Sequence, residues 1–228
     1  DVCLVRLGAT STYFGHAVVA EIARAGALVI NSPDALRVAC DKLRAQHFLA
    51  RSSVPTPDTI LLRRPPNLDL VAEQLGFPVV AKTISGSKGA GVALCGDREA
   101  LSDLVDMLAS SGASGELILQ AFVANSRGRD VRVIVVGDEV VAAMERFSET
   151  SFKSNFSRGG KVRSVEITPE LSSLAIRAAR ALQLDIAGVD LLYGPDGYLV
   201  CEVNSAPGFE GMEKCHPGMN VPRLLFEY

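Results

Sequence analysis

Two acidic side chains and one amide occur at positions where they could hold a metal ion together. Asp190 lies in one apolar run, and Glu202 and Asn204 lie two residues apart in the next run. Alternate residues of a strand share a face, and a turn centred near Asp196 would place Asp190 opposite Glu202. Facing carboxylates repel each other unless a cation lies between them, and such hard oxygen ligands suit magnesium. A solvated hairpin face is the alternative, but charges embedded in apolar strands need a partner.

A lysine followed by a glycine-rich segment is a candidate phosphate-binding site. Lys82 ends a β-rich run, and Gly86 and Gly89 follow it in segment 84–91. Glycines let backbone N–H groups approach an anion closely. The spacing is neither that of a P-loop nor that of a dinucleotide fingerprint. A plain glycine-rich hairpin loop is therefore the alternative for this segment taken alone.

Further charged residues could share the face of the metal site. Asp130 and Arg132 alternate with apolar residues on one expected strand, and Arg146 ends the next strand. This alternation places their side chains on one face of the sheet. Salt bridges on a surface strand are the alternative interpretation.

A polar loop over residues 148–160 carries three side chains that could bind an anion. Lys153, Asn155 and Arg158 could grip a phosphate or a carboxylate, arginine through its planar fork. An ordinary solvated loop is the alternative. The histidines are isolated in the sequence, so neither a zinc site nor a Ser-His-Asp triad is supported.

Composition and charge exclude several classes of protein. The 228 residues are 48% hydrophobic and 21% charged with a net charge of −3, which is typical of a globular protein in solution. This charge provides no global field that would attract nucleic acid, and no stretch approaches the roughly 20 apolar residues of a membrane span. The five cysteines are odd in number and lack metal-ligand spacing, so we expect reduced thiols in a cytoplasmic protein. The chain opens inside an apolar run, so we expect an upstream segment.

The pattern of apolar residues and turn residues predicts an α+β protein. Asn31-Ser32-Pro33 is a helix-start signal for one helix running through Phe48. The Gly-Asp pair at 137–138 and the run 194–197 predict two β-hairpins. The expected strands cover 1–5, 27–30, 59–62, 78–83, 92–94, 117–120, 131–136, 140–144, 188–192 and 198–203, and the other expected helices cover 16–25, 68–75, 98–109 and 169–182.

Short motifs in order along the chain resemble the RimK branch of the ATP-grasp family. The likeness covers essentially the whole chain, and the runs 154–160 and 202–208 are its most specific parts. The motifs are Asp41-Lys42-Leu43-Arg44, Lys82 with its glycine loop, Gln120-Ala121-Phe122-Val123, Gly128-Arg129-Asp130-Val131-Arg132, Ser154-Asn155 with Arg158-Gly159-Gly160, Gly188-Val189-Asp190-Leu191-Leu192 and Glu202-Val203-Asn204.

The resemblance implies an ATP-grasp fold in which two α+β subdomains sandwich ATP. Residues 1–40 would be the end of an α/β pre-ATP-grasp domain, 41–116 the central subdomain, and 117–228 the C-terminal subdomain with the metal site. Two magnesium ions, or manganese, would be held by Asp190, Glu202 and Asn204.

The resemblance also implies roles for the remaining residues. Arg146, Arg158 and Asn155 would act on the transferring group. Family members commonly carry an acid where this chain has Ala121 and in the loop where it has Ser85, and a lysine is frequent at the position of Glu145. The nucleotide would contact Lys42, Lys82, Gly86, Gly89, Gln120, Ala121, Phe122, Val123, Asp130, Arg132, Lys153, Ser154 and Asn155.

The activity implied by the resemblance is an ADP-forming ligase that joins a carboxylate to an amine through an acyl phosphate. Glutamate would be added to a carboxylate acceptor, either the C-terminus of a ribosomal protein or a small acid such as N-acetylaspartate or citrate. We further expect a homo-oligomer that binds neither membrane nor nucleic acid. A non-catalytic ATP-binding module of synapsin type and a ligase for D-amino acids are the alternatives, and the loop 154–160 argues against the second.

Overall fold

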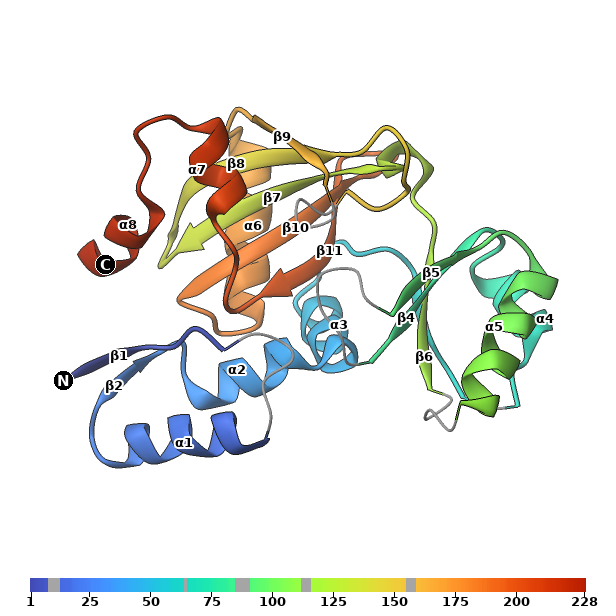
Figure 1. Ribbon diagram of the computed structural model, residues 1–228, viewed down its shortest axis with the longest axis horizontal. Helices are drawn as coiled ribbons and strands as arrows, with labels where there is room; N and C mark the ends of the chain where they lie inside the picture. The colour runs from blue at the N-terminus through green and yellow to red at the C-terminus, as the bar shows by residue number, and fades with distance from the viewer. Residues whose placement is uncertain (8–12, 64, 85–90, 112–115, 155–158) are drawn as a thin grey trace.

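The computed structural model describes residues 1–7, 13–63, 65–84, 91–111, 116–154 and 159–228. Three β-sheets and their helices follow one another along the chain, and two of the sheets face each other across the middle of the molecule (Figure 1). The α+β class predicted from the sequence is confirmed. Within the described residues, no helix combines the length and the apolar character needed to cross a membrane.

The N-terminal unit is a small α/β layer. Its two parallel strands pack with two helices over a core that includes Val19 and Leu36. The side chain of Ser32 caps the second of these helices by accepting from the backbone N–H of Ala35, as the helix-start signal predicted. The elements are β1 (Val2–Leu4), α1 (Tyr13–Arg24), β2 (Leu28–Ile30) and α2 (Pro33–Cys40).

The prediction of one helix from Pro33 through Phe48 is wrong. The chain leaves the helical conformation at Asp41, where φ is −104° and ψ is 106°, and a second helix, α3 (Lys42–Arg51), begins at the next residue. The Asp41 carboxylate accepts from the backbone N–H groups of Leu43 and Arg44, each at 3.0 Å. An aspartate can thus end one helix and cap the next, because its short side chain competes for backbone donors.

A four-stranded antiparallel sheet forms one wall of the central region. Its strand order is β3-β6-β4-β5, and two helices cover its outer face (Figure 1). These helices pack over a core that includes Val79, Leu101 and Leu119. The elements are β3 (Thr59–Leu62), α4 (Leu68–Gln74), β4 (Val79–Thr83), β5 (Val92–Cys95), α5 (Arg98–Ser110) and β6 (Leu117–Ala121).

A five-stranded antiparallel sheet forms the opposite wall, in the order β11-β10-β7-β8-β9. The helix α6 packs on one face together with α3, and the two C-terminal helices cover the other face (Figure 1). The elements are the 3-10 turn η1 (Ala124–Ser126), β7 (Arg129–Val136), β8 (Glu139–Phe147), β9 (Lys161–Ser164), α6 (Pro169–Ala181), β10 (Ile186–Tyr193), β11 (Tyr198–Asn204), α7 (Glu210–Cys215) and α8 (Val221–Glu227).

Both predicted hairpins are present in this sheet. Gly137 has a φ of 59° at the turn between β7 and β8, a conformation that glycine adopts without a steric penalty. In the second hairpin Asp190 lies opposite Glu202, as the turn residues predicted. The register shifts between Asp190 and Leu191, so Cys201 is an extra residue and β11 carries a bulge.

The predicted division into three domains stays a prediction. The strand β6 pairs with β3 and β4, although the predicted boundary between residues 116 and 117 assigns it to the C-terminal subdomain. The helix α3 contributes Ala45 and Leu49 to the core beneath the five-stranded sheet, although its sequence lies in the predicted central subdomain.

Candidate active site

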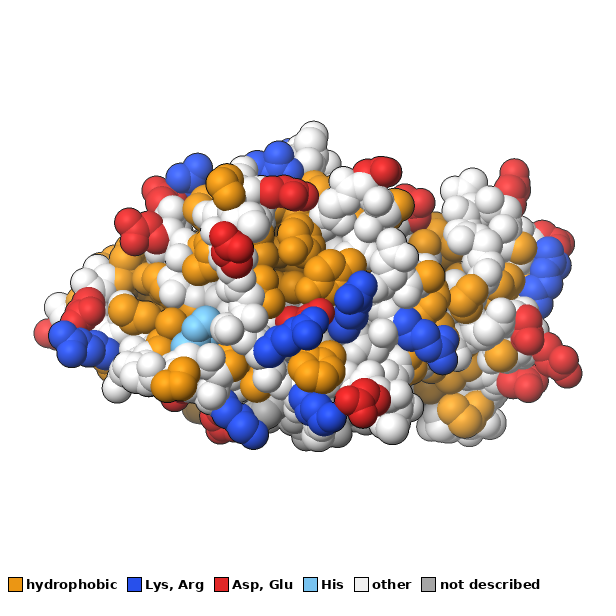
Figure 2. Space-filling view, turned by 90° about the horizontal axis from the view of Figure 1, so that it is seen from above, with side chains coloured by type: hydrophobic (Ala, Val, Ile, Leu, Met, Phe, Trp, Pro, Cys, Tyr) orange, Lys and Arg blue, Asp and Glu red, His pale blue; other side chains and the backbone are white. Residues whose placement is uncertain are grey.

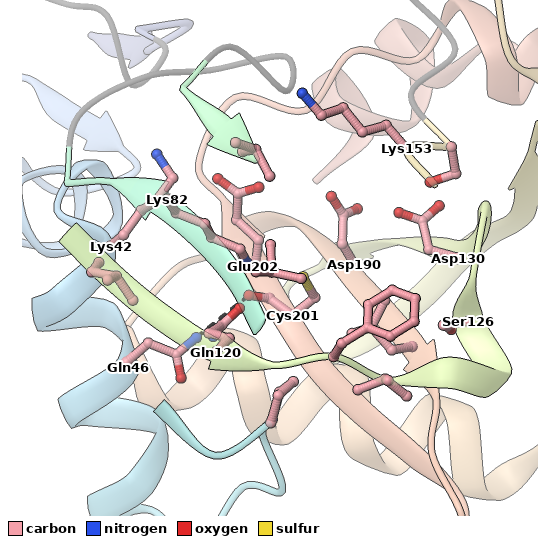
Figure 3. A pocket seen from close by; sticks show the side chains of 18 of the residues that line it. Lys42, Gln46, Lys82, Gln120, Ser126, Asp130, Lys153, Asp190, Cys201 and Glu202 are labelled. Carbon is pink, nitrogen blue, oxygen red and sulfur yellow. Dashed lines mark hydrogen bonds between the residues drawn. The ribbon is translucent and has the colours of Figure 1, made fainter. Parts of the chain in front are cut away.

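A cleft lies between the two large sheets, and charged side chains from both walls enter it. Figure 3 shows Asp130, Asp190 and Glu202 pointing into one space, with Lys42 and Lys82 on one side of it and Lys153 on the other. The three acids come from β7, β10 and β11, whereas Lys82 is the next-to-last residue of β4 and Lys42 begins α3. The cleft therefore depends on the packing of elements that are far apart in the sequence.

The carboxylate of Asp190 is the centre of a buried charge network. Arg132 donates to both of its oxygens, from Nε to Oδ1 and from Nη2 to Oδ2, each at 2.7 Å. Arg146 Nη2 lies 3.0 Å from Oδ2 of the same carboxylate. Such two-pronged contacts fix the orientation of a carboxylate as well as stabilising its charge.

Arg146 joins this carboxylate to a second one. Its guanidinium also forms a two-pronged pair with Asp130, its register partner on β7, with Nε 2.7 Å from Oδ1. Both side chains are buried. Burial alone would lower the pKa of Arg146, but the charges of Asp190 and Asp130 outweigh burial and raise it. Arg146 is therefore a fixed positive charge at the base of the cleft.

The ionisation of Asp190 follows from the same contacts. Burial favours the neutral acid, but Arg132 and Arg146 stabilise the carboxylate by charge and by hydrogen bonds. Together the two arginines lower the pKa of Asp190 to about 2. Asp190 is thus an anion at neutral pH.

The lysines of the cleft lie close to Glu202 and Cys201. Burial lowers the pKa of Lys42, and nearby Lys82 lowers it further, whereas Glu202 opposes the shift. The Nζ of Lys82 lies 3.5 Å from Sγ of Cys201. Burial raises the pKa of the Cys201 thiol, so this cysteine is a neutral neighbour of the lysine. Lys42 and Lys82 thus bring two positive charges to the same end of the cleft.

The residues Asp190, Glu202 and Asn204 form an oxygen-rich set that fits a hard divalent cation. Asn204 Nδ2 lies 3.3 Å from the carbonyl of Gly188 and 3.4 Å from Oδ2 of Asp190, so the amide is held beside the carboxylate. Because Asp190 already accepts from two arginines, a cation at this carboxylate would compete with them. Within the described residues, no three His, Cys, Asp or Glu side chains cluster as a metal site, so the amide is needed to complete the set.

The strand β6 and the segment after it line the apolar part of the cleft. Gln120 is buried, and its Nε2 donates to Oγ1 of Thr59 at 3.0 Å. Ala121, Phe122 and Val123 follow along the cleft wall. Apolar side chains from the sheets complete this wall, namely Val80, Val92, Ile118 and Leu192. A flat aromatic base would find both apolar surface and backbone polar groups here.

Most of the residues predicted from the sequence meet at this cleft. Arg132 and Asn204 do not line it directly but contact Asp190, which does. Gly86, Gly89, Asn155 and Arg158 lie outside the described residues. The predicted residues that line the cleft are Lys42, Lys82, Gln120, Ala121, Phe122, Val123, Asp130, Arg146, Lys153, Ser154, Asp190 and Glu202.

Several lining residues were missed by sequence analysis. Gln46, Arg129, Phe152 and Cys201 all border the cleft. The helical spacing of Gln46 after Lys42 was a usable signal, since residues four apart share a helix face. Cys201 had no such signal, because the bulge that admits it is visible only in the strand register.

Comparisons with known proteins agree with this architecture. A model of the RimK-like ATP-grasp domain matches residues 39–228. A probable alpha-L-glutamate ligase from a Picosynechococcus species is 40% identical over 230 residues, covering 100% of this chain and 75% of that protein. The ribosomal protein bS6–L-glutamate ligase of Shigella boydii is 39% identical over 216 residues, covering 94% of this chain and 71% of that protein.

A solved structure shares the fold. The ATP-grasp ligase PsnB, in complex with a phosphomimetic variant of its minimal precursor, Mg and ADP, superposes with a TM-score of 0.73 at 24% identity. The match covers 94% of this chain and 65% of that chain. The two sheets that face each other across a charged cleft thus have the ATP-grasp fold. More narrowly, the chain belongs to the RimK-like ATP-grasp family and is a ligase.

Proposed function

We propose that this enzyme uses ATP to add glutamate to a carboxylate acceptor through an acyl-phosphate intermediate. The observation that carries the proposal is the buried network in which Arg132 and Arg146 hold Asp190 beside Glu202, facing the lysines of the cleft. Such an arrangement suits a reaction in which negative charge moves between phosphate and carboxylate oxygens.

In the first step, an oxygen of the acceptor carboxylate attacks the γ-phosphorus of ATP, and the bond to the bridging oxygen breaks to release ADP. Lys42 and Lys82 hold the phosphate oxygens, and Arg146 offsets charge on the group in transfer. Asp190, Glu202 and Asn204 would hold magnesium, which supplies further positive charge to the phosphates.

In the second step, the amine of glutamate attacks the acyl carbon, and inorganic phosphate leaves as the amide forms. Water must be kept from the acyl phosphate, because hydrolysis would waste the activated group. Lys153 lies on the side of the cleft opposite Lys42 and Lys82 (Figure 3), and Ser154 also lines the cleft. Lys153 and Ser154 are therefore placed to border the reacting groups.

The similarity to a ligase that modifies ribosomal protein bS6 favours a protein C-terminus as the acceptor. The test is incubation with ATP, magnesium and glutamate, offering in turn a bS6 C-terminal peptide, N-acetylaspartate and citrate. We expect ADP release and a mass gain of one glutamyl unit with the peptide. A glutamyl product from a small acid alone would replace that acceptor, and ATP binding without ADP production would favour the non-catalytic module.

A further inference from the structure

An arginine of the N-terminal unit lies at the loop that follows β11, the strand that carries Glu202 and Asn204. Arg6 comes just after β1, and its Nη2 donates to the carbonyl oxygen of Pro207 at 2.8 Å. Figure 1 shows the chain after β1 beside the C-terminal end of β11. Pro207 follows Asn204 by three residues, so their Cα atoms are at most about 11 Å apart.

The guanidinium of Arg6 is held in place without a carboxylate partner. Its Cζ lies over the ring of Phe209, 5.0 Å from the ring centroid, and the carbonyl of Pro207 engages one of its nitrogens. In the described part of the chain Arg6 forms no ion pair. A guanidinium carries five N–H donors, so most of its capacity is available to a ligand.

The attachment of the N-terminal unit to this loop does not depend on Arg6. Asn31 is buried, and its amide donates to the carbonyls of Ile186 and Ser205 at 2.8 and 3.1 Å. Its oxygen also accepts from the backbone N–H of Ile186 at 2.8 Å. The side chain of Asn31 therefore attaches the N-terminal unit to β10 and to the loop after β11, and Arg6 adds one hydrogen bond and the contact with Phe209.

We propose that Arg6 binds a non-reacting carboxylate of the incoming glutamate and so selects the amino-acid substrate. The inference rests on the proposed function. The acceptor's reacting carboxylate must lie at the phosphate beside Asp190 and Glu202, whereas glutamate keeps both of its carboxylates through the reaction. A planar fork fixed by a carbonyl and an aromatic ring recognises such a carboxylate with little loss of entropy.

The experiment compares the wild type with Arg6→Gln on glutamate, on glutamine, which lacks the γ-carboxylate, and on isoglutamine, which lacks the α-carboxylate. We expect Arg6→Gln to lower kcat/KM for glutamate by about 10- to 100-fold, with the KM for ATP and the unfolding midpoint unchanged. The analogue that lacks the carboxylate bound by Arg6 should be used equally by both proteins. Arg24→Gln is the matched control, because Arg24 is exposed on α1 and pairs with Glu21.

Each other result overturns the inference. An unchanged kcat/KM for glutamate, or equal losses on all three amino acids, would leave Arg6 with a structural role only. If Arg6→Gln does not fold, Arg6→Lys keeps the charge but loses the fork, and the same selective loss is required of it. A wild type that makes no glutamyl product removes the proposed function as well, whereas product formation that is indifferent to Arg6 removes this inference alone.

Discussion

Two acids of the site differ in what surrounds them. Asp190 is buried and shared between Arg132 and Arg146, so its charge is already balanced by the protein. Glu202 is only partly buried and, among the described residues, forms no ion pair. A substitution at Glu202 therefore removes a proposed metal ligand and breaks no ion pair among the described residues. A substitution at Asp190 would also remove the carboxylate that pairs with Arg132 and Arg146.

Glu202→Gln should abolish turnover while the fold persists. We expect ADP release to fall by about 100-fold or more, because a charge that organises the transition state is lost. Thermal unfolding should stay close to that of the wild type. Glu73→Gln on α4, where the side chain is exposed, is the control and should keep full activity. Full activity of Glu202→Gln would contradict its assignment to the metal site.

The low pKa of Asp190 makes the free energy of unfolding depend on pH in the acidic range. Its value is lowered from 3.8 to about 2 in the folded protein, so the stabilisation is present above about pH 4 and is lost as the pH falls through about 2. Arg132→Gln should raise the pKa of Asp190 and so reduce the change in the free energy of unfolding with pH. Urea unfolding at a series of pH values from about 2 to 6 measures it. Arg180→Gln, from an exposed pair with Asp138, should behave as the wild type does, and equal slopes in both variants would refute the account.

At the scale of the element, the break between α2 and α3 places Lys42 in the first turn of a helix that lines the cleft. Asp41→Ala removes the cap of α3, which should cost about 1 kcal/mol of stability and also weaken ATP binding by disordering Lys42. Asn67→Ala is the matched control, because Asn67 caps α4, which lies on the outer face of the four-stranded sheet. Calorimetric titration with ATP measures the difference. Equal ATP affinities in the two variants would contradict a role for this cap in the site.

Sequence patterns predicted the strands and helices whose signals are local. The two hairpins, the start of α6 at Pro169 and the pairing of Asp190 with Glu202 were all predicted from local sequence signals. The strand β9 was missed because its sequence, Lys-Val-Arg-Ser, is short and polar and forms an edge. The helices α7 and α8 were missed because each has fewer than eight residues and depends on packing against the sheet.

The candidate site was predicted in part. The acids and lysines of the site could be predicted from the sequence together with its family resemblance, because the motifs that contain them occur in the order typical of the family. The pairing of Arg132 with Asp190 rather than with a ligand was not predictable, since alternation gives the face of a side chain but not its partner. The bulge at Cys201 depends on a cross-strand register that no single strand encodes.

At the scale of the whole molecule, both sheets supply walls of one cleft, so a bound nucleotide should stabilise them together. ATP at about 100 times its Kd should add about 2.7 kcal/mol to the free energy of unfolding. Hydrogen exchange should slow in β4 and in β10 alike. Protection confined to one sheet would show that the nucleotide does not bridge the cleft.

The charge of the cleft is opposite in sign to that of the protein. The chain carries a net charge of −3, yet Lys and Arg side chains gather near the middle of one face around a small acidic spot (Figure 2). Asp130, Asp190, Arg132 and Arg146 balance one another, so among the described residues of the cleft Lys42, Lys82, Lys153 and Arg129 remain, with Glu202 as the remaining acid. An approaching polyphosphate is thus repelled at long range and attracted only within about 10 Å, the screening length at 0.1 M salt. The final capture of ATP therefore depends on the local charge of the cleft, and added salt can speed the distant approach while it slows that capture.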